Sequence, residues 1–467
     1  MRDATASALA CGKRRQMARE ERRGRIPNPD KSDGAGTSAI ESLPPATSGQ
    51  VMSASWTREH HAAQDFVASS CRPEHDEAGL ESIEKAADRV LEETGIRFLD
   101  DPQTIDMLKQ IGGVASGDVV RLDGTELRSI IRRHAPAKFL LRGRNPARDT
   151  LVGASAPPVF APIYGAPNVV LGNGKRVAGT RQIYAELVAA AHAALGLTNT
   201  GQMICVMEDV PEDRRPLEML LAHLIHSDKP FMGSIASPAA AEAVADLTAA
   251  AVGRPAAARE CNLLHLINAT PPLTYWPNPL KCLRAIALKG EASMVSSYMM
   301  MGATSPVTVA GALIQGYAEV LAGLALAQLW RPGAPVVMGI LAYPFDMRRM
   351  LPDFGDPASQ LVQHYAAKLG RRLGVPVRGD GAITSAKVDD AQSGAEGGRV
   401  LSAAVSSGAH FILHATGWLE QGRTVSLEKF HRDAAALAEL GHGKPADLPM
   451  HLDHGIEAEI RGRLAQS

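Results

Sequence analysis

Side chains able to bind or transform a small ligand recur directly after the apolar runs of residues 156–440. They are aromatic rings, carboxylates, two cations, a threonine and one histidine: Tyr164, Tyr298, Tyr343, Asp346, Arg348, Thr384, Lys387, His414, Trp418 and Glu420. If the runs are parallel strands, their carboxyl ends meet at one rim, where these side chains would converge. Polar residues at such a rim are more often simply solvated than catalytic. A functional rim and a merely solvated one therefore both stay open on this pattern.

Eight short apolar runs alternate with eight helical patterns in the body of the chain. The runs span residues 158–163, 202–206, 230–235, 262–267, 293–298, 335–341, 375–378 and 409–413. The helical patterns span residues 182–194, 216–226, 239–251, 279–289, 307–330, 360–373, 397–407 and 426–440. A strand followed by a helix, repeated over roughly 280 residues, is typical of a (β/α)8 TIM barrel. The competing doubly wound sheet is disfavoured, because no GxGxxG follows the first run. We therefore predict an α/β fold built on a (β/α)8 barrel.

The chain divides into four predicted parts. Residues 1–75 hold a basic run interrupted by acidic residues, followed by several prolines and glycines, which favours a disordered extension over a nucleic-acid arm or an organelle address. Residues 76–155 carry helical and extended patterns and are expected to pack on the barrel. The barrel takes residues 156–440, and residues 441–467 form a C-terminal tail. Gly172-Asn173-Gly174 between two apolar runs predicts a tight β-hairpin rather than a phosphate loop.

Composition excludes several classes of protein. The 467 residues carry 49 Lys and Arg against 50 Asp and Glu, so a surface built to grip nucleic acid is not expected. The five cysteines form no CxxC pair, which fits a reducing cytoplasm. No uncharged apolar run reaches about 18 residues, and the most apolar segment, 307–330, contains Gln315, Glu319 and Gln328. We therefore predict a cytoplasmic protein without a membrane or nucleic-acid partner. No HxH or HExxH pair follows a run, so no metal site is predicted.

Several blocks of this sequence resemble one known family. The most distinctive is Met-Gly-Ala-Thr-Ser-Pro-Val-Thr at 301–308, which continues through Gly311, Gln315, Glu319 and Gly323. Further blocks are Thr94-Gly95-Ile96, Leu141-Arg142-Gly143-Arg144-Asn145-Pro146, Asp209-Val210-Pro211, Ser227-Asp228-Lys229-Pro230, Asp346-Met347-Arg348 and Gly417-Trp418-Leu419-Glu420. In this order and spacing they resemble the trimethylamine:corrinoid methyltransferase family over residues 80–430.

The resemblance implies a (β/α)8 barrel and a specific activity. Members pass a methyl group from a methylated amine to the Co(I) of a separate corrinoid protein that docks over the barrel mouth. The resemblance therefore implies no tightly bound cofactor and a corrinoid protein as partner. We also expect a homo-oligomer. The founding members hold the amine with pyrrolysine, which is absent from these 467 residues. A quaternary amine such as glycine betaine is therefore the expected substrate, rather than trimethylamine.

The chemistry of a quaternary ammonium fits the rim residues. Such a cation has no N–H to donate, so aromatic faces and a nearby carboxylate must recognise it. Tyr164, Tyr298, Tyr343, Phe345 and Trp418 supply the rings, and Asp346, Glu319 and Glu420 are candidate counter-charges. Arg348 or Lys387 would bind a substrate carboxylate. We assign Glu319, Asp346 and His414 to catalysis, and Thr384 to substrate binding with the rim residues. The alternatives are that Glu319 pairs within the barrel wall, His414 is a wall histidine, and the tyrosines are core residues.

Departures from the family pattern motivate a second hypothesis. Ala358 stands where the family carries a carboxylate, and Ala395 stands where it carries an aromatic ring. The segment after residue 443 resembles the family poorly. The alternative is an amine-binding or regulatory barrel that has lost methyl transfer. A metal-dependent hydrolase is a third, weaker hypothesis.

Overall fold

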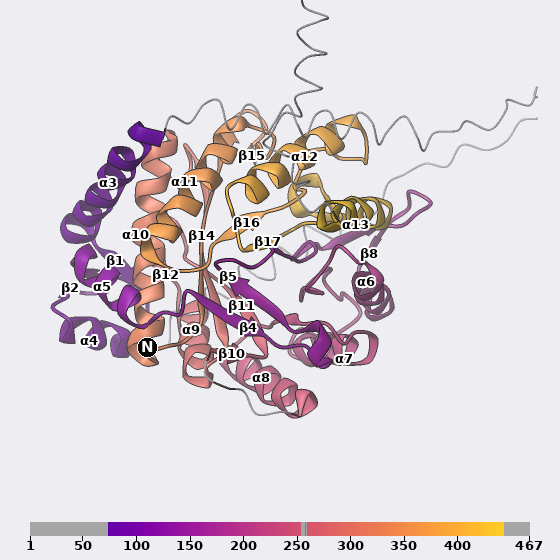
Figure 1. Ribbon diagram of the computed structural model, residues 1–467, viewed down its shortest axis with the longest axis horizontal. Helices are drawn as coiled ribbons and strands as arrows, with labels where there is room; N and C mark the ends of the chain where they lie inside the picture. The colour runs from indigo at the N-terminus through magenta and orange to yellow at the C-terminus, as the bar shows by residue number, and fades with distance from the viewer. Residues whose placement is uncertain (1–72, 254–256, 258, 443–467) are drawn as a thin grey trace, which may run out of the picture. The chain divides into compact units, whose positions relative to one another are not determined.

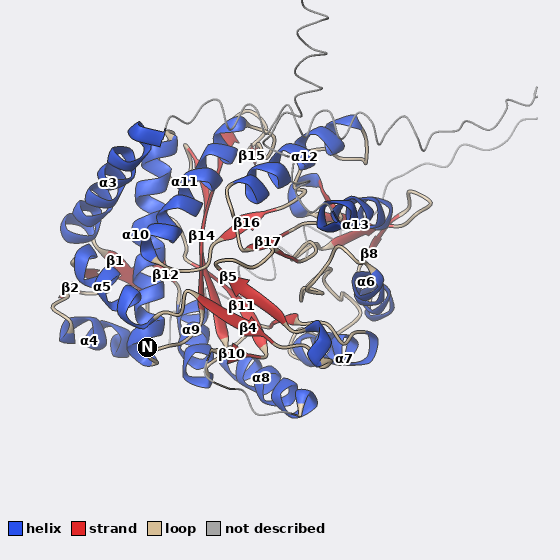
Figure 2. Ribbon diagram, viewed as in Figure 1, coloured by secondary structure: helices blue, strands red, loops and turns tan. Residues whose placement is uncertain are grey.

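The computed structural model describes residues 73–253, 257 and 259–442. The predicted extension and tail lie almost wholly outside these residues. The described part is a mixed α/β structure, with strands in the interior and helices outside them (Figure 1 and Figure 2). The predicted mixed α/β class is therefore confirmed.

The first described elements form a helical and extended segment that packs on the helix α10 (Val309–Trp330). Its members are α3 (Pro73–Arg89), a π-helical turn (Val90–Thr94), β1 (Ile96–Phe98), α4 (Pro102–Gln110), β2 (Val114–Ser116), β3 (Val119–Arg121) and α5 (Gly124–His134). Asp101 and Asp123 cap α4 and α5 by accepting backbone N–H groups of the first turn. A short strand, β12 (Thr274–Tyr275), pairs with β1 in parallel and ties this segment to the rest.

Four neighbouring parallel strands lie in the interior. They are β9 (Phe231–Gly233), β11 (Leu263–Asn268), β13 (Ala292–Met301) and β14 (Val336–Asp346), with β15 (Leu351–Pro352) antiparallel at the edge. Right-handed crossovers between such strands need helices. Here these helices are α8 (Pro238–Val252), α9 (Pro277–Lys289) and α10, and α11 (Pro357–Leu373) follows β14.

A second parallel group consists of β6 (Val159–Phe160), β17 (Phe411–Leu413) and β16 (Arg378–Asp380). A bridge between Met338 and Val377 connects β14 to the start of β16. The helix α12 (Ala391–Ser406) joins β16 to β17. A strand pair, β4 (Lys138–Leu141) and β5 (Thr150–Gly153), bonds to β10 (Glu260–Cys261). A 3-10 turn (Pro146–Arg148) lies within the β4–β5 connection.

The predicted strand at 202–206 is wrong. Only Cys205 makes a bridge there, to Ala166. The backbone that bonds to the neighbouring strands lies earlier, at residues 198–201: Thr198 and Asn199 donate to Phe160 O, and Thr200 donates to Pro230 O. Gly201 has a φ of 74° and its N–H is bound by the Asn199 side chain, so the chain turns away before the predicted strand begins.

The remaining described elements are short strands, a turn and three helices. They are β7 (Asn168–Val170), β8 (Arg176–Ala178), α6 (Arg181–Ala193), α7 (Arg215–His226), β18 (Trp418–Leu419), a 3-10 turn (Glu420–Gly422), β19 (Thr424–Ser426) and α13 (Leu427–His442). β7 and β8 pair antiparallel across the Gly172-Asn173-Gly174 turn, which confirms the predicted hairpin. β19 pairs with β7 in parallel, and β18, which carries Trp418, pairs with the other edge of β19.

The interior strands have two different faces. Val295 and Met299 of β13 pack with α10, whereas Met294 packs with Val337 and Leu413 of other strands. We call the face that carries Met294, Val337 and Leu413 the inner face. Because side chains alternate along a strand, Ser296, Tyr298 and Met300 share that face with Met294. Among the described residues, α10 is long and apolar enough to cross a membrane, yet most of its side chains are buried inside the protein.

Candidate active site

An aromatic cluster occupies the carboxyl ends of the interior strands. We define it as five rings in sequential contact: Tyr298, Tyr343, Phe354, Trp418 and His414. Their ring centroids lie 5.5 Å, 4.5 Å, 5.4 Å and 4.5 Å apart in that order. The rings meet at tilted or edge-to-face angles, as aromatic quadrupoles favour. Residues separated by up to 120 positions in sequence thus form one apolar surface.

Strand register explains how the two tyrosines meet. Met300 of β13 pairs with Tyr343 of β14, and Tyr298 lies two positions earlier on the same face. This diagonal spacing lets neighbouring rings touch. Tyr343 is buried while Tyr298 is partly exposed, so Tyr298 forms the more accessible side of the cluster.

Trp418 is fixed by two contacts of its own segment. Its indole Nε1 donates to the Thr384 carbonyl at 3.1 Å. The preceding residue, Gly417, donates its N–H to Asp433 at 3.0 Å, and Asp433 also accepts from Lys429 at 2.7 Å. Both contacts hold the tryptophan ring against Phe354 and His414.

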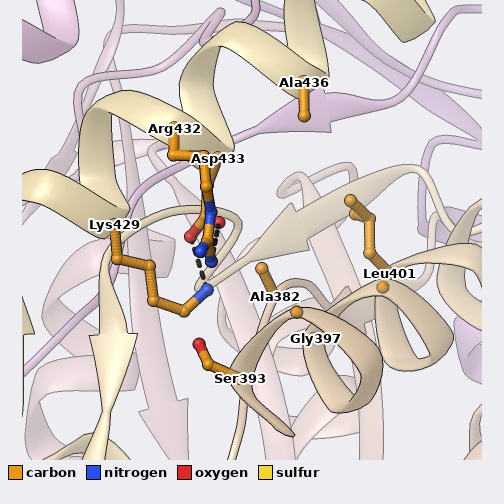
Figure 3. A pocket seen from close by; sticks show the side chains of 10 residues that line it. Ala382, Ser393, Gly397, Leu401, Lys429, Arg432, Asp433 and Ala436 are labelled. Atoms are coloured by element: carbon orange, nitrogen blue, oxygen red, sulfur yellow. Dashed lines mark hydrogen bonds and ion pairs between the residues drawn. The ribbon is translucent and has the colours of Figure 1, made fainter. Parts of the chain in front are cut away.

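That anchoring ion pair lies in a small pocket between α12 and α13 (Figure 3). Glycines of α12 and Ser393 line one side, and Lys429, Arg432 and Asp433 line the other. Buried Lys429 pairs with the partly buried carboxylate of Asp433, so the two charges compensate each other. The pocket is therefore a structural junction, separate from the aromatic cluster.

A buried ion pair lies beside the aromatic cluster. Arg378 Nη2 donates to Asp380 Oδ1 at 2.9 Å, and both side chains are almost wholly buried, at 4% and 1% exposure. The Tyr343 hydroxyl donates to Asp380 Oδ2, and Arg378 Nη1 donates to Ser296 Oγ at 3.2 Å. Gly339 of β14 makes room for this arrangement, because a Cβ there would lie 3.2 Å from Arg378 Cδ. The pair sits on the inner face next to Tyr343.

His414 lies between the backbone N–H of Tyr164 and the guanidinium of Arg378. Its Nδ1 accepts the Tyr164 N–H at 3.2 Å, and its Nε2 lies 3.3 Å from Arg378 Nη2. A protonated imidazole has no acceptor for either group. Burial lowers the pKa of His414 to about 3, with Arg378 adding to the effect against the opposing charge of Asp380. His414 is therefore neutral at physiological pH.

Thr384 belongs to the loop that accepts the Trp418 indole N–H through its own backbone carbonyl. Its hydroxyl donates to Glu396 Oε2 at 2.7 Å, and the same oxygen accepts the Ser385 N–H at 2.8 Å. Ser385 Oγ in turn accepts the Phe354 N–H at 3.1 Å. Glu396 thus fixes the loop that supports two rings of the cluster.

Glu319 lies on the opposite side of β13 from Tyr298. Its carboxylate accepts from Leu273 N at 2.7 Å, from Gln315 Nε2 at 2.9 Å and from Ser297 Oγ. Ser297 and Tyr298 are consecutive on a strand, so they point to opposite faces. Burial raises the pKa of Glu319, and these hydrogen bonds partly offset that rise. The structure does not bring Glu319 together with the aromatic cluster.

Four other predicted residues lie at the periphery. Arg348 and Lys387 are exposed. Asp346 accepts the N–H groups of Arg348 and Arg349, which lowers its pKa. Glu420 accepts from Arg176 Nη1 at 2.6 Å and from Thr424 Oγ1 at 2.8 Å. Each of these carboxylates already holds a local partner.

Tyr164 is the last of the predicted site residues. It is partly exposed and packs beside the strand residues of the inner face. Burial of its hydroxyl raises its pKa to about 12, so the phenol is neutral. The structure thus brings Tyr298, Tyr343, Trp418 and His414 together, with Tyr164 and Thr384 bonded to members of that cluster.

Sequence reasoning did not nominate Phe354 or Arg378. Phe354 lies in a loop without periodicity, so no local signal marked it. Arg378 did carry a signal, because it is a charged residue at the end of an apolar run. No group of three or more His, Cys, Asp or Glu side chains suited to a metal lies in the part of the chain that the structure describes.

Comparisons with known proteins agree on one family. The family described as trimethylamine methyltransferase (MTTB) matches residues 54–446. The glycine betaine methyltransferase of Desulfitobacterium hafniense is 35% identical over 364 residues, which cover 78% of this chain and 75% of that protein. The proline betaine:corrinoid methyltransferase of Eubacterium limosum is 27% identical over 369 residues, covering 76% and 74%.

Two proteins of Methanosarcina barkeri also match. The trimethylamine methyltransferase of Methanosarcina barkeri is 37% identical over 164 residues, 35% of this chain and 33% of that protein. The crystal structure of the monomethylamine methyltransferase of Methanosarcina barkeri aligns over 77% of this chain and 72% of that one, at 13% identity and a TM-score of 0.43. That score is too low to support an argument. The family match covers most of the sequence, and the chain belongs to the trimethylamine methyltransferase (MTTB) family.

Proposed function

We propose that this chain is a methyltransferase that moves a methyl group from a methylated amine to the Co(I) of a corrinoid carried by a partner protein. The observation that carries the proposal is the aromatic cluster beside the Arg378–Asp380 pair. It occurs in a chain whose relatives are named as betaine and trimethylamine methyltransferases. The methyl acceptor belongs to the partner, so the barrel itself needs no tightly bound cofactor.

The cluster suits a quaternary ammonium. Such a cation is poorly hydrated and binds aromatic faces by cation–π attraction, worth up to about 2 kcal/mol in a desolvated site. Tyr298, Tyr343 and Trp418 supply faces, and the Asp380 carboxylate held by Tyr343 supplies negative charge. Tyr164 is proposed as a further wall of the site. Asp346 and Glu420 remain proposed counter-charges at the periphery.

The protonation state of the site favours a quaternary over a tertiary amine. When the methyl carbon of a quaternary ammonium bonds to cobalt, its C–N electron pair stays on nitrogen and the amine leaves neutral. No proton transfer is required. A free tertiary amine would first have to be protonated to become a comparable leaving group. Neutral His414 cannot supply that proton, so its proposed role is to fix Tyr164 and Trp418 rather than to act as an acid.

We also propose that the strands close into one (β/α)8 barrel. Support comes from the hydrogen bonds of residues 198–201 to Phe160 O and Pro230 O, which lie between β6 and β9. The bridge between Met338 and Val377 spans β14 and β16 in the same way. With these links each strand of the proposed barrel would have two neighbours, and the site would lie at their carboxyl ends. Residues 76–155 would pack on this barrel, with α3 and α5 against α10 and with β4 and β5 beside β10.

Catalytic roles for Glu319 and Asp346, and carboxylate binding by Arg348 or Lys387, stay predictions. A cytoplasmic location and a homo-oligomeric state are likewise proposed. Buried free thiols at Cys205, Cys261 and Cys282 suit a reducing compartment.

The decisive experiment is methyl transfer to chemically reduced cob(I)alamin. The purified protein is given glycine betaine, proline betaine, carnitine, choline and trimethylamine in turn, and methylcobalamin and the demethylated amine are quantified. Stoichiometric formation of both from a quaternary amine is expected. If a folded protein yields neither with any amine, while calorimetry detects amine binding, the binding-protein hypothesis replaces this one. Without binding or turnover, both fail.

A further inference from the structure

We propose that residues 452–464 of the C-terminal segment fold into an amphipathic helix that packs along an exposed apolar stripe of α7. We define this stripe as Leu217, Leu221 and Ile225. Neither surface belongs to the aromatic cluster, so the proposal is independent of methyl transfer. The contact is a property of this chain in particular, because the family match ends at residue 446.

The stripe is exposed over its whole length. Leu217, Leu221 and Ile225 are 46%, 52% and 63% exposed, and their spacing of four residues places them on one face of α7. Leu195, in the turn that follows α6, is 75% exposed. Single exposed leucines are ordinary on a protein surface, whereas a row of large apolar side chains indicates a contact surface. The α7 stripe is such a row.

The C-terminal segment carries the complementary pattern. Four apolar side chains recur there at every fourth position: Leu452, Ile456, Ile460 and Leu464. Charged residues fill much of the sequence between them, which predicts a helix with one apolar face. A short helix that contains Gly455 and Gly462 is marginal in water on its own. It therefore needs an apolar surface, and rows of side chains four residues apart on two helices interdigitate.

The path from α13 to the stripe is short. α13, α6 and α7 follow one another on the right side of Figure 1. A Cβ on Gly196, just after α6, would lie 2.5 Å from the Cβ of Leu437, so the last turns of α13 touch this turn. Lys229, just beyond α7, donates to the Ala194 and Leu197 carbonyls at 2.7 Å and 2.8 Å. The C-terminal end of α7 therefore lies beside the same turn.

Residues 443–451 are long enough to bridge the distance. Fully extended, they span about 30 Å at about 3.3 Å per residue. Two steps between neighbouring helix axes amount to about 20 Å. The segment then enters the stripe at its C-terminal end and runs antiparallel to α7. The side chains that face each other in this register are Ile456 with Ile225, Ile460 with Leu221, and Leu464 with Leu217.

Charges favour the same direction. The antiparallel helix brings Arg461 and Arg463 to the start of α7, where Glu212 and Asp213 are exposed beside one exposed cation, Arg214. Opposite charges at the edge of a contact contribute little affinity but select one orientation. The apolar row therefore supplies the affinity, and the charges supply the direction.

The test measures how fast trypsin cleaves after Arg461 in the full chain, followed by mass spectrometry. Cleavage needs the undocked segment, so its rate follows the undocked population. Burial of one leucine or isoleucine side chain corresponds to about a 10- to 100-fold change in an equilibrium. We expect Ile225→Gln and Ile456→Gln each to accelerate cleavage about tenfold. Leu288→Gln, at a comparably exposed leucine of α9, is the matched control and should leave the rate unchanged.

Double variants show whether the two side chains meet. Ile225→Gln combined with Ile456→Gln should be cleaved little faster than either single variant, because both remove the same contact. Leu217→Gln combined with Ile456→Gln joins positions that are out of register, so their effects should multiply. Equal behaviour of the two pairs overturns the proposed register. Equal cleavage of the wild type and the single variants overturns the docking itself.

Protein concentration distinguishes this contact from an interface between copies of the chain. Docking within one chain makes the cleavage rate independent of protein concentration and leaves the sedimentation mass of Ile225→Gln equal to that of the wild type. Protection that grows with concentration, together with a lower mass for Ile225→Gln, assigns the stripe to a second copy and overturns the proposal. None of these measurements requires methyl transfer, so a failure of the proposed function leaves them interpretable.

Discussion

Replacement of Tyr298 by alanine should weaken cation binding with a limited effect on folding. Tyr298 is the partly exposed end of the aromatic cluster, and its ring centroid lies 5.5 Å from that of Tyr343. The remaining rings contact one another without it. The substitution therefore removes one face of the proposed cation site and leaves the other rings supported.

The expected losses of binding free energy and of folding stability both follow from the position of the Tyr298 ring. One desolvated cation–π contact contributes about 1–2 kcal/mol, which corresponds to a rise in Kd of about 5- to 30-fold. Complete burial of an aromatic ring would make its removal cost about 3–5 kcal/mol of folding stability. Because Tyr298 is partly exposed, we expect a smaller loss. The effect on binding should therefore be measurable in folded protein.

Calorimetry with tetramethylammonium isolates the cation contact from any carboxylate contact. Tyr298→Phe retains the ring and should bind within about threefold of the wild type. Tyr365→Ala removes a partly exposed tyrosine of α11 and serves as the matched control, with unchanged affinity expected. The reasoning is refuted if folded Tyr298→Ala binds as tightly as the wild type. It is also refuted if the phenylalanine variant loses as much as alanine, since the hydroxyl would then matter and not the ring face.

Three further predictions test the surroundings of the site. Asp380→Asn leaves buried Arg378 without its counter-ion and should lower the free energy of unfolding by about 3–5 kcal/mol in urea titrations. The pKa of His414 is depressed when folded, so its contribution to stability is complete above about pH 6.5 and is lost as the pH falls toward 3. His414→Gln should flatten the loss of urea stability between those limits, and an unchanged slope would contradict the assignment. Gly316→Ala places a Cβ 2.6 Å from Ile340 and should destabilise by about 1–3 kcal/mol, whereas Gly394→Ala meets nothing within 4 Å and should stabilise slightly by thermal melting.

The helices were predictable because each carries several independent local signals. The pattern at 279–289 lies within α9 (Pro277–Lys289), where prolines occupy the first turn and Gly290 ends the helix with a φ of 78°. Strands carry fewer signals. At 202–206 the apolar run matched a strand, but the Asn199–Gly201 turn moved the hydrogen-bonding backbone upstream. The Asn199 side chain that binds the Gly201 N–H lies before the apolar run, so the run itself carries no sign of this turn.

The site was predictable only where strand position alone decides the outcome. Tyr298 and Tyr343 lie on neighbouring strands, and Met300, the partner of Tyr343, is on the same face as Tyr298, which lies two residues earlier. Their contact therefore needs only the correct strand order. Phe354 enters from a loop, where its N–H is bound by the Ser385 hydroxyl, and Glu396 accepts the backbone N–H of the same serine. Arg378 was overlooked for a different reason. Its charge seemed to end a strand, whereas it is compensated by Asp380 two residues later on the same face.

The block that marks the family most strongly serves the scaffold rather than the aromatic cluster. Within residues 301–323, Gly316 permits close contact of α10 with Ile340 and Met299 on the outer side of the strands. Glu319 binds the Leu273 N–H and Ser297 on that same side. A helix packed along a strand needs correct residues at many consecutive positions, so its sequence forms a continuous signature. A ligand site needs one side chain from each of several loops, so each loop contributes only one isolated residue to the sequence pattern. Recognition of a family and recognition of its chemistry therefore depend on different parts of the chain.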